Sequence, residues 1–221
     1  MKIVSVILAR GGSKGIPRKN LIDLNGSPLI SYAINASLNS DVNETWVSSD
    51  DEEIMEVSRR YGARTLRRPT ELAEDESTSE SALSHFVNNV ESDYTVFIQP
   101  TSPLLLAEDI NKGIELLSKY EYDSVFSAYE EHWTGRWKVN PRDEHKGTLR
   151  PSNYTLDKRP RRQDLLYTTY IENGAFYISS TSAMRLSCTR LNGRIGVLKM
   201  PQYRSFQIDT LNDLTLVEKL L

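Results

Sequence analysis

Residues 1–20 read MKIVSVILARGGSKGIPRKN, and this stretch decides the fold. Positions 3–8 are rich in β-branched side chains and almost continuously apolar, which is typical of a strand buried on both faces of a parallel sheet. The residues that follow, 10–20, hold three glycines and a proline and therefore predict a loop. A buried strand that runs directly into such a loop predicts that the loop lies at the carboxyl edge of the sheet.

Strand-like and helix-like patterns alternate along the rest of the chain. Further strands are predicted at 44–49, 64–67, 94–98, 123–128, 175–178 and 194–200, and helices at 28–38, 50–61, 79–90, 109–120 and 212–220. This alternation predicts an α/β fold with a mostly parallel sheet and right-handed crossovers. Ligands of such sheets bind beyond the carboxyl ends of the strands, so the loops after Leu8, Ser49, Ile98 and Ala128 are expected to share one rim.

Composition excludes several classes of function. The 221 residues include 27 Lys and Arg against 30 Asp and Glu, a net charge of -3, so the basic face that binds duplex nucleic acid is not expected. The single cysteine, Cys188, cannot form an intrachain disulfide and suits a reducing compartment. The first apolar run stops at Arg10 and is too short for a membrane span, so we expect a cytoplasmic protein with no membrane partner.

Residues 130–170 interrupt the alternation of strands and helices. The segment holds two tryptophans, Trp133 and Trp137, two histidines and a dense run of basic residues. A structureless loop of this length would be unusual in a compact domain, so we interpret the chain as one domain, residues 1–221, with an inserted substructure at 130–170. The insertion is long and aromatic enough to reach a partner subunit, and a homodimer is expected.

The glycine-rich loop is a candidate anion site. Glycines let backbone N–H groups approach a phosphate, and four basic residues, Arg10, Lys14, Arg18 and Lys19, add positive charge. The spacing is neither that of a Walker A loop nor the Gly-x-Gly-x-x-Gly pattern of dinucleotide folds. Because the loop follows the first strand directly, phosphate binding is favoured over a solvated turn.

Residues 8–21 resemble the opening signature of the acylneuraminate cytidylyltransferases, the CMP-sialic acid synthetases. The resemblance continues in order over nearly the whole chain, through residues 46–50, 67–72, 75–79, 99–103, 122–127, 158–164 and 172–174. The first loop is shared with related sugar nucleotidyltransferases. The later segments RPRRQD, at 159–164, and ENG, at 172–174, are more specific and point to the animal-like branch of the family.

This resemblance implies a fold and a reaction. The fold would be a Rossmann-like sheet of the nucleotidyltransferase type with a protruding dimerisation element. In the reaction, which uses Mg²⁺, the anomeric hydroxyl of a 2-keto sugar acid attacks the α-phosphate of CTP and gives a CMP-sugar and pyrophosphate. Such a transfer depends mostly on positioning and on charge neutralisation.

The resemblance also implies roles for individual residues. Those at nucleotide-binding positions are Arg10, Gly11, Gly12, Ser13, Lys14, Lys19, Asn20, Arg68 and Ser79, and Arg10 and Lys19 are expected to be catalytic as well. Those expected to bind the sugar acid are Gln99, Thr101, Ser102, Arg162, Tyr170, Glu172 and Asn173. Arg162 is the expected anchor, because arginine grips a planar carboxylate through two parallel hydrogen bonds. For Arg159 and Arg161, a solvated or subunit-interface run is a strong competing interpretation.

One position departs from the family pattern. The family presents Asp-x-Asp near the C-terminus, two carboxylates that face the same way and suit Mg²⁺. Here the segment reads SFQID, residues 205–209, so Gln207 replaces the first carboxylate and Asp209 remains as the catalytic metal ligand. Since a glutamine offers a carbonyl oxygen but no charge, the affinity for magnesium is expected to fall.

Three functions compete at this stage. The first is a cytidylyltransferase that uses CTP and N-acetylneuraminate or a close analogue. The second belongs to the same class but activates another 2-keto sugar acid, such as legionaminate, pseudaminate or deoxy-octulosonate. The third is a nucleotide-binding protein that has lost catalysis; Gln207 alone supports it, whereas the phosphate loop, Gln99 and Arg162 oppose it.

Overall fold

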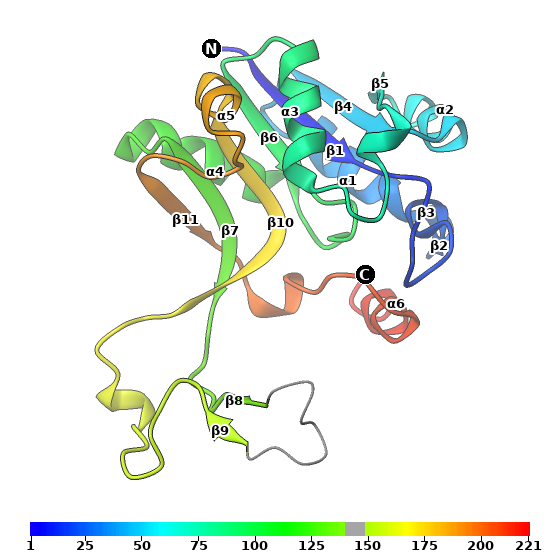
Figure 1. The fold of residues 1–221 in the computed structure, drawn as a ribbon. Helices are drawn as coiled ribbons and strands as arrows, with labels where there is room; N and C mark the ends of the chain where they lie inside the picture. The colour runs from blue at the N-terminus through cyan, green and yellow to red at the C-terminus, as the bar shows by residue number, and fades with distance from the viewer. Residues whose placement is uncertain (140–148) are drawn as a thin grey trace. The chain divides into compact units, whose positions relative to one another are not determined.

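A computed structural model describes residues 1–139 and 149–221. The chain divides into two compact units, residues 1–129 together with 172–221, and residues 130–171. In the described residues, the larger unit is built on a seven-stranded sheet with the order β11-β7-β10-β6-β1-β4-β5 (Figure 1). Its strands are β1 (Ile3–Leu8), β4 (Glu44–Ser49), β5 (Arg64–Arg67), β6 (Tyr94–Ile98), β7 (Ser124–Glu130), β10 (Tyr170–Ser180) and β11 (Ile195–Lys199).

The sheet is mostly parallel, which confirms the predicted fold class. Strand β1 lies between β4 and β6 and pairs in parallel with both, and β4 pairs in parallel with β5. Strand β11 is parallel to β7. Strand β10 departs from this trend, because it runs antiparallel to β6, with Phe176 opposite Ile98.

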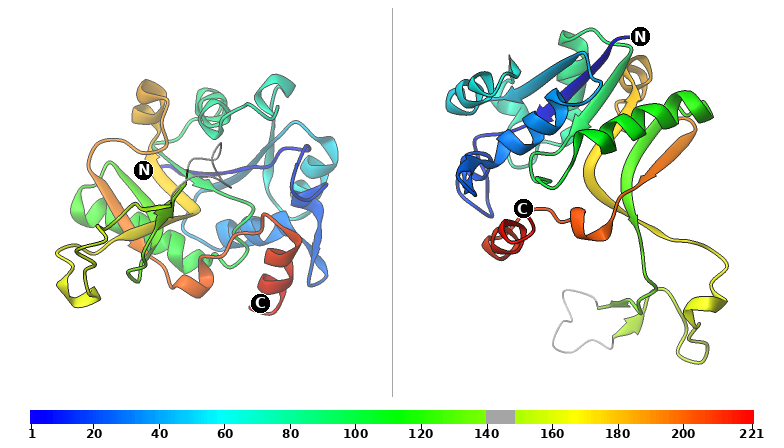
Figure 2. Two further views of the ribbon diagram at one scale, coloured as in Figure 1. Left: turned by 60° about the horizontal axis from the view of Figure 1, so that its bottom comes forward. Right: turned by 180° about the vertical axis from the view of Figure 1, so that it is seen from behind.

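Helices cover both faces of this sheet (Figure 1, Figure 2). They are α1 (Leu29–Leu38), α2 (Glu52–Arg60), α3 (Ser79–Asn89), α4 (Ala107–Tyr120), α5 (Thr181–Ser187) and α6 (Leu211–Glu218). Alternation along β1 explains the two layers: Ile3 and Ile7 pack in a core with α1, α2 and α4, whereas Val4 and Val6 pack in a second core with α3 and α5. The strand is therefore buried on both faces, as its apolar run predicts.

A third, smaller core joins two segments that are far apart in the sequence. Ile16, from the glycine-rich loop, packs with Ile208 and with Val217 of α6. The short hairpin of β2 (Asp23–Leu24) and β3 (Ser27–Pro28) adds Leu24 to this cluster. The packing places the C-terminal segment next to the loop that follows β1, which matters for the site.

The smaller unit has an aromatic centre of its own. Tyr154 makes edge-on contacts with Trp133 and Trp137, at centroid distances of 6.1 and 6.0 Å. The Arg159 guanidinium lies over the rings of Trp133 and Tyr154, at 5.3 and 5.7 Å from their centroids. The described part of this unit contains the antiparallel pair β8 (Trp137–Lys138) and β9 (Arg150–Pro151) and the turn of 3-10 helix η4 (Arg162–Asp164).

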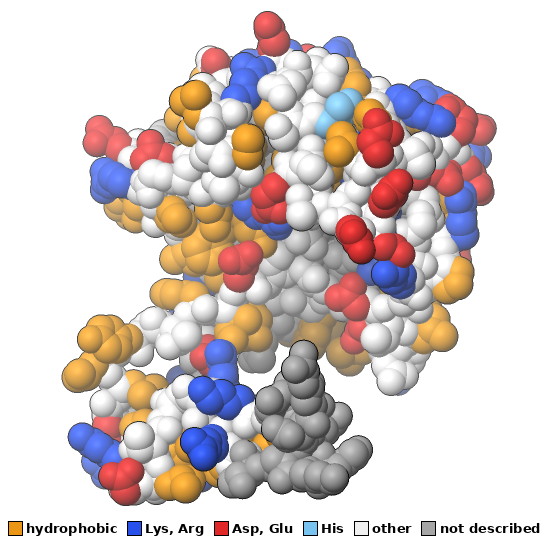
Figure 3. Space-filling model, in the orientation of Figure 1, with side chains coloured by type: hydrophobic (Ala, Val, Ile, Leu, Met, Phe, Trp, Pro, Cys, Tyr) orange, Lys and Arg blue, Asp and Glu red, His pale blue; other side chains and the backbone are white. Residues whose placement is uncertain are grey.

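Two elements of the larger unit were not anticipated in full. The strand predicted at 175–178 is the eleven-residue β10, and the helix α5 that follows it was not predicted. Acidic and basic side chains are interspersed on the face drawn in Figure 3 rather than gathered into one basic patch. Among the described residues, no helix combines the length and the apolar character that crossing a bilayer requires.

Candidate functional site

A cleft of about 330 Å³ lies beyond the carboxyl ends of β1 and β6. Parallel strands bring the loops that follow them to one edge, and this edge is where α/β sheets bind ligands. The lining residues are Leu8, Arg10, Ser13, Lys14, Gly15, Lys19, Asn20, Ser79, Phe97, Gln99, Pro100, Thr101 and Asp209. The cleft thus brings together predicted nucleotide-binding residues, two predicted sugar-binding residues and the predicted metal ligand.

Three cations of the glycine-rich loop face this cleft, and two carboxylates hold them. Asp75 bridges Arg10 and Lys14, with nitrogen–oxygen distances of 3.0 Å to each. The Lys14 ammonium and the Arg10 guanidinium lower the pKa of the Asp75 carboxyl. Lys19 is nearly buried and pairs with Asp209 at 2.8 Å. The fourth basic residue of the loop, Arg18, turns instead to Asp51 and Glu53.

The loop takes its shape from contacts that only small or amide side chains allow. A Cβ atom on Gly15 would lie 2.6 Å from the backbone oxygen of Asp209, so glycine is required for the loop to approach that segment. The backbone N–H of Gly11 donates to the Asp50 carboxylate at 3.0 Å. The buried Asn20 amide donates to the Arg10 carbonyl at 2.9 Å and so holds the loop closed. Gly12 has open space around its Cα.

Arg68 lies in an adjoining cavity of about 240 Å³, which Arg10, Asp75 and Ser79 also line. The residue is only 5% exposed, yet its Nε and one terminal nitrogen have no hydrogen-bond partner among the described residues. Burial lowers the pKa of this guanidinium; nearby Asp50 acts in the opposite direction. Burying donors without hydrogen-bond partners is costly, so Arg68 is a candidate to bind an anionic or polar ligand in the cavity that it lines.

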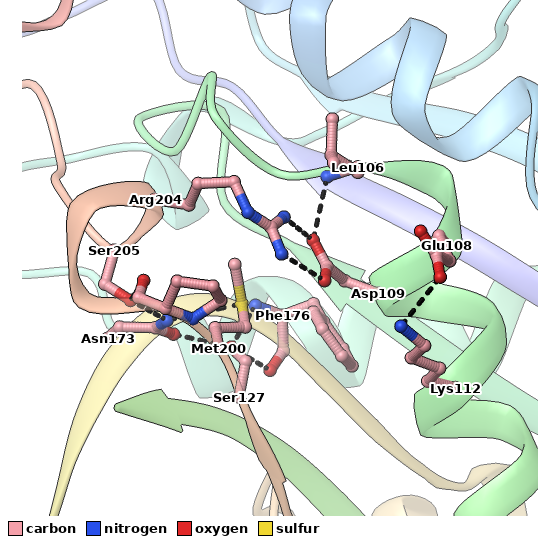
Figure 4. A network of polar contacts seen from close by, with 11 residues as sticks. Leu106, Glu108, Asp109, Lys112, Ser127, Asn173, Phe176, Met200, Arg204 and Ser205 are labelled. Atoms are coloured by element: carbon pink, nitrogen blue, oxygen red, sulfur yellow. Dashed lines mark hydrogen bonds and ion pairs between the residues drawn. The ribbon is translucent and has the colours of Figure 1, made fainter. Parts of the chain in front are cut away.

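The predicted sugar-binding residues of the larger unit fall into two groups. Gln99 and Thr101 line the first cleft, and Ser102 lies beside them with a buried hydroxyl. Asn173, by contrast, is buried and committed to the framework (Figure 4). Its Oδ1 accepts from the Ser127 hydroxyl at 2.6 Å and from a backbone N–H at 3.1 Å, and its Nδ2 donates to Ser205.

Glu172 is also engaged, since its carboxylate accepts a hydrogen bond from the Tyr177 hydroxyl. Burial, followed by the hydrogen bond to Glu172, raises the pKa of the Tyr177 hydroxyl. The Tyr177 ring stacks on Phe97, a residue of the cleft wall, with centroids 5.6 Å apart. Glu172 therefore contacts the cleft wall indirectly, through Tyr177 and the Phe97 ring on which Tyr177 stacks.

Arg162 and Tyr170 belong to the smaller unit. Arg162 lines a cavity of about 350 Å³ within that unit, together with Glu130 and Glu131. Its neighbour Arg161 is taken up by Asp164, with contacts of 2.8 and 2.9 Å. Arg159, as described above, lies over aromatic rings, so of the three arginines Arg162 is the one that faces a cavity.

The metal-binding capacity of the cleft rests on one carboxylate. Asp209 is exposed and already paired with Lys19, and Gln207 turns its amide nitrogen toward the carbonyl of Asn173 at 2.5 Å. Among the described residues, no group of three or more His, Cys, Asp and Glu side chains is arranged to hold a metal. These residues do not form a protein-built metal cage, but a single carboxylate fits Mg²⁺ that arrives bound to phosphates and water.

Comparison with known proteins identifies the family of this chain. The sequence profile of a protein family described as Cytidylyltransferase matches residues 4–220. The chain belongs to the cytidylyltransferase family.

Relatives of this family member differ in length and in named activity. The chain is 39% identical over 206 residues to N-acylneuraminate cytidylyltransferase B of Danio rerio, an alignment that covers 93% of this chain and 48% of that protein. It is 32% identical over 224 residues to pseudaminic acid cytidylyltransferase of Campylobacter jejuni, covering 97% of this chain and 94% of that one. The chain therefore spans about half the length of the N-acylneuraminate relative and nearly all of the pseudaminic acid relative.

Solved structures show the cytidylyltransferase fold at low sequence identity. One is a CMP:2-keto-3-deoxy-manno-octonic acid synthetase complexed with CTP, with a TM-score of 0.71, 19% identity and coverage of 100% of this chain and 98% of that chain. Another is a 4-diphosphocytidyl-2C-methyl-D-erythritol synthase from Anaerococcus prevotii, with a TM-score of 0.71, 12% identity and coverage of 99% and 97%. At these identities the likeness establishes the fold alone.

The cytidylyltransferase cleft also contains contacts that sequence reasoning missed. Asp75 lies in one of the segments that resemble the family, but no role is predicted for it from the sequence. An acidic residue that can pair with a basic loop is a signal that could have identified it. No pattern in the sequence indicates the role of Arg190. Its guanidinium pairs with Glu80, which is 110 residues away, at 2.6 Å. Its guanidinium lies 5.3 Å from the ring centroid of Phe97 and 5.0 Å from that of Tyr177, so it supports the aromatic wall from behind.

Proposed function

We propose that this chain binds CTP in the cleft beyond β1 and β6 and transfers CMP to the anomeric hydroxyl of a sialic-acid-type nonulosonic acid, releasing pyrophosphate. The observation that carries the proposal is the convergence of Arg10, Lys14 and Lys19 on a cleft beside the unpartnered Arg68. The relatives named N-acylneuraminate and pseudaminic acid cytidylyltransferase support the same chemical class.

The triphosphate binds against the glycine-rich loop. Phosphate oxygens take the places that the carboxylates of Asp75 and Asp209 hold beside the three cations. Charge-assisted hydrogen bonds of this kind are about twice as strong as neutral ones, and glycine N–H groups add further donors. Arg68, which lines the adjoining cavity, adds positive charge beside the nucleotide.

The reaction needs no covalent intermediate with the enzyme. The anomeric hydroxyl attacks the α-phosphorus, the bond to the bridging oxygen of pyrophosphate breaks, and the hydroxyl proton is released. Arg10 and Lys19 offset the negative charge on the phosphoryl oxygens in the transition state, which is the main catalytic lever in phosphoryl transfer. Gln99 and Thr101 on the cleft wall orient the sugar. Arg162, which lines a cavity of the smaller unit, is proposed as a carboxylate anchor from the family resemblance.

Magnesium is the proposed cofactor. Asp209, the carboxylate of the cleft lining, would hold the ion together with the triphosphate, and the ion would neutralise phosphate charge. The partly buried Lys19 pairs with Asp209 at the edge of the cleft.

The proposed assembly is a homodimer of a cytoplasmic protein. The smaller unit exposes large apolar side chains, among them Leu156, Leu166 and Tyr167, which are 74%, 87% and 82% exposed. Side chains of this kind on a small unit favour burial against a partner subunit. The free Cys188 is compatible with a reducing compartment. Light scattering that gives a monomer mass across micromolar concentrations would contradict the dimer.

Pseudaminate is the second candidate acceptor, because a relative named for it is 32% identical over 97% of this chain, whereas the N-acylneuraminate relative is 39% identical over 93%. A pyrophosphate-release assay with CTP and a panel of 2-keto sugar acids distinguishes the two acceptors. We expect turnover with one nonulosonic acid and none when CTP is replaced by ATP. CTP binding by calorimetry without pyrophosphate release from any acid would instead identify a protein that has lost catalysis.

A further inference from the structure

Gln207 makes a contact that a carboxylate could not make. Its Nε2 donates a hydrogen bond to the backbone carbonyl of Asn173 at 2.5 Å. The opposite amide orientation would set two oxygens against each other, so the nitrogen must face the carbonyl. Gly174 fits this arrangement, because it has a φ of +70° and a Cβ atom there would lie 2.2 Å from the same nitrogen.

The contact belongs to a set of anchors on the segment 201–209. Asn173 binds the segment a second time through Nδ2, which donates to the Ser205 hydroxyl at 2.9 Å. One residue earlier, Arg204 pairs with the buried Asp109 at the start of α4, with one contact at 2.9 Å (Figure 4). Both anchors lie before Gln207 in the sequence, so neither of them holds the end of the segment that carries Asp209.

Gln207 acts on the part of the segment that reaches the cleft. The next residue, Ile208, is fully buried and donates its backbone N–H to the Thr101 carbonyl at 2.9 Å. Asp209 then meets Lys19. Near Gly174, the Gln99 amide nitrogen lies 3.3 Å from the position that a Cβ atom would take at that glycine. The Gln207 amide and Gln99, a residue of the cleft wall, thus both lie beside Gly174.

We propose that Gln207 is a positioning residue: its amide clasps the Asn173 carbonyl and thereby fixes Asp209 beside Lys19, and it is not a ligand of magnesium. The inference rests on the proposed function for its catalytic consequence, but the clasp itself is a property of the folded chain. The clasp needs a hydrogen-bond donor at position 207, whereas a metal ligand needs an oxygen. Substitutions that separate donor from oxygen therefore decide between the two roles.

The test uses Gln207→Met, which keeps the length and removes both groups, and Gln207→Glu, which removes the donor and adds a charged oxygen. Gln202→Met, at an exposed position of the same segment, is the control. We expect both variants at 207 to lower kcat about tenfold, the usual effect of one lost hydrogen bond, with the magnesium concentration for half-maximal rate unchanged. Hydrogen exchange of the Ile208 amide should become about tenfold faster in both variants and stay as in the wild type for the control.

The alternative outcomes overturn the proposal. If Gln207→Glu lowers the magnesium requirement and keeps its kcat while Gln207→Met loses activity, the residue is a metal ligand. If the Ile208 amide exchanges at the wild-type rate in both variants, there is no clasp. Hydrogen exchange can be measured without turnover. A wild type that activates no sugar acid would therefore refute the proposed function, while the clasp could still be measured.

Discussion

Replacing Arg68 by methionine should make the protein more stable and at the same time weaken its binding of CTP. The guanidinium is 5% exposed, and its Nε and one terminal nitrogen have no hydrogen-bond partner among the described residues. Methionine is unbranched and adaptable, so it can fill the space of the arginine stem without bringing polar atoms. The perturbation therefore removes the unpartnered charge and leaves the packing nearly intact.

The magnitude follows from the cost of buried donors. An unsatisfied buried polar group costs about 1–3 kcal/mol. Attraction to Asp50 offsets part of this cost at Arg68, so we expect Arg68→Met to raise the free energy of unfolding by about 1–2 kcal/mol. For a chain of 221 residues, 1 kcal/mol corresponds to a shift in Tm of about 2–4 °C, which predicts a rise of about 2–8 °C.

The assay pairs thermal unfolding with calorimetric titration of CTP. The matched control is Arg67→Met, because Arg67 is the preceding residue, is exposed and pairs at the surface with Glu52. We expect the control to change stability by less than about 0.5 kcal/mol and to bind CTP as the wild type does. The variant at Arg68 should weaken CTP binding at least about tenfold, as loss of a charge-assisted hydrogen bond does. A lower Tm together with unchanged CTP affinity would refute the reasoning, since it would show that Arg68 is a structural cation.

Four further substitutions test the site. Lys19→Ala and Arg10→Ala should each cripple CTP use without unfolding the chain, because each removes a phosphate-facing cation; Lys112→Ala, a surface change on α4, is the control, and wild-type kinetics in either variant would remove that residue from the site. Arg162→Ala should raise the KM for the sugar acid about ten- to a hundredfold and leave the KM for CTP unchanged, as measured by steady-state kinetics; lost CTP affinity instead would show that the assignment is wrong. Asp209→Asn should nearly abolish turnover at every magnesium concentration, because Asp209 is the one carboxylate among the described lining residues of the cleft, and Asp75 in the adjoining cavity is paired with Arg10 and Lys14. A magnesium titration in which Asp209→Asn stays active would exclude Asp209 as the metal ligand.

Much of the fold could be predicted from local patterns. The apolar run at β1 can be satisfied only by burial on both faces, and Ile3 and Val4 do pack in separate cores. The strand-and-helix alternation predicts the parallel sheet, and the loop after β1 then falls at its carboxyl edge with Arg10 and Lys19 facing a cleft. The sequence is sufficient here because periodicity and chain direction determine which faces and which edge a segment occupies.

The partners of individual side chains depend on tertiary structure. No local sequence pattern indicates that the Asn173 amide forms hydrogen bonds with Ser127 and Ser205. The pairing of Arg190 with Glu80 is equally absent from any local pattern. The same holds for the unpartnered nitrogens of Arg68, which the sequence presents only as one of two adjacent arginines.

Gln207 illustrates the division most clearly. By itself the sequence determined that a carboxylate is missing two residues before Asp209, and from this it predicted weaker magnesium binding. Only the tertiary structure decided what the amide does instead, because the Asn173 carbonyl arrives from a strand 34 residues away. Hydrogen bonds form between groups that the fold brings within about 3 Å, and no periodicity in the sequence encodes which distant backbone oxygen lies at that distance.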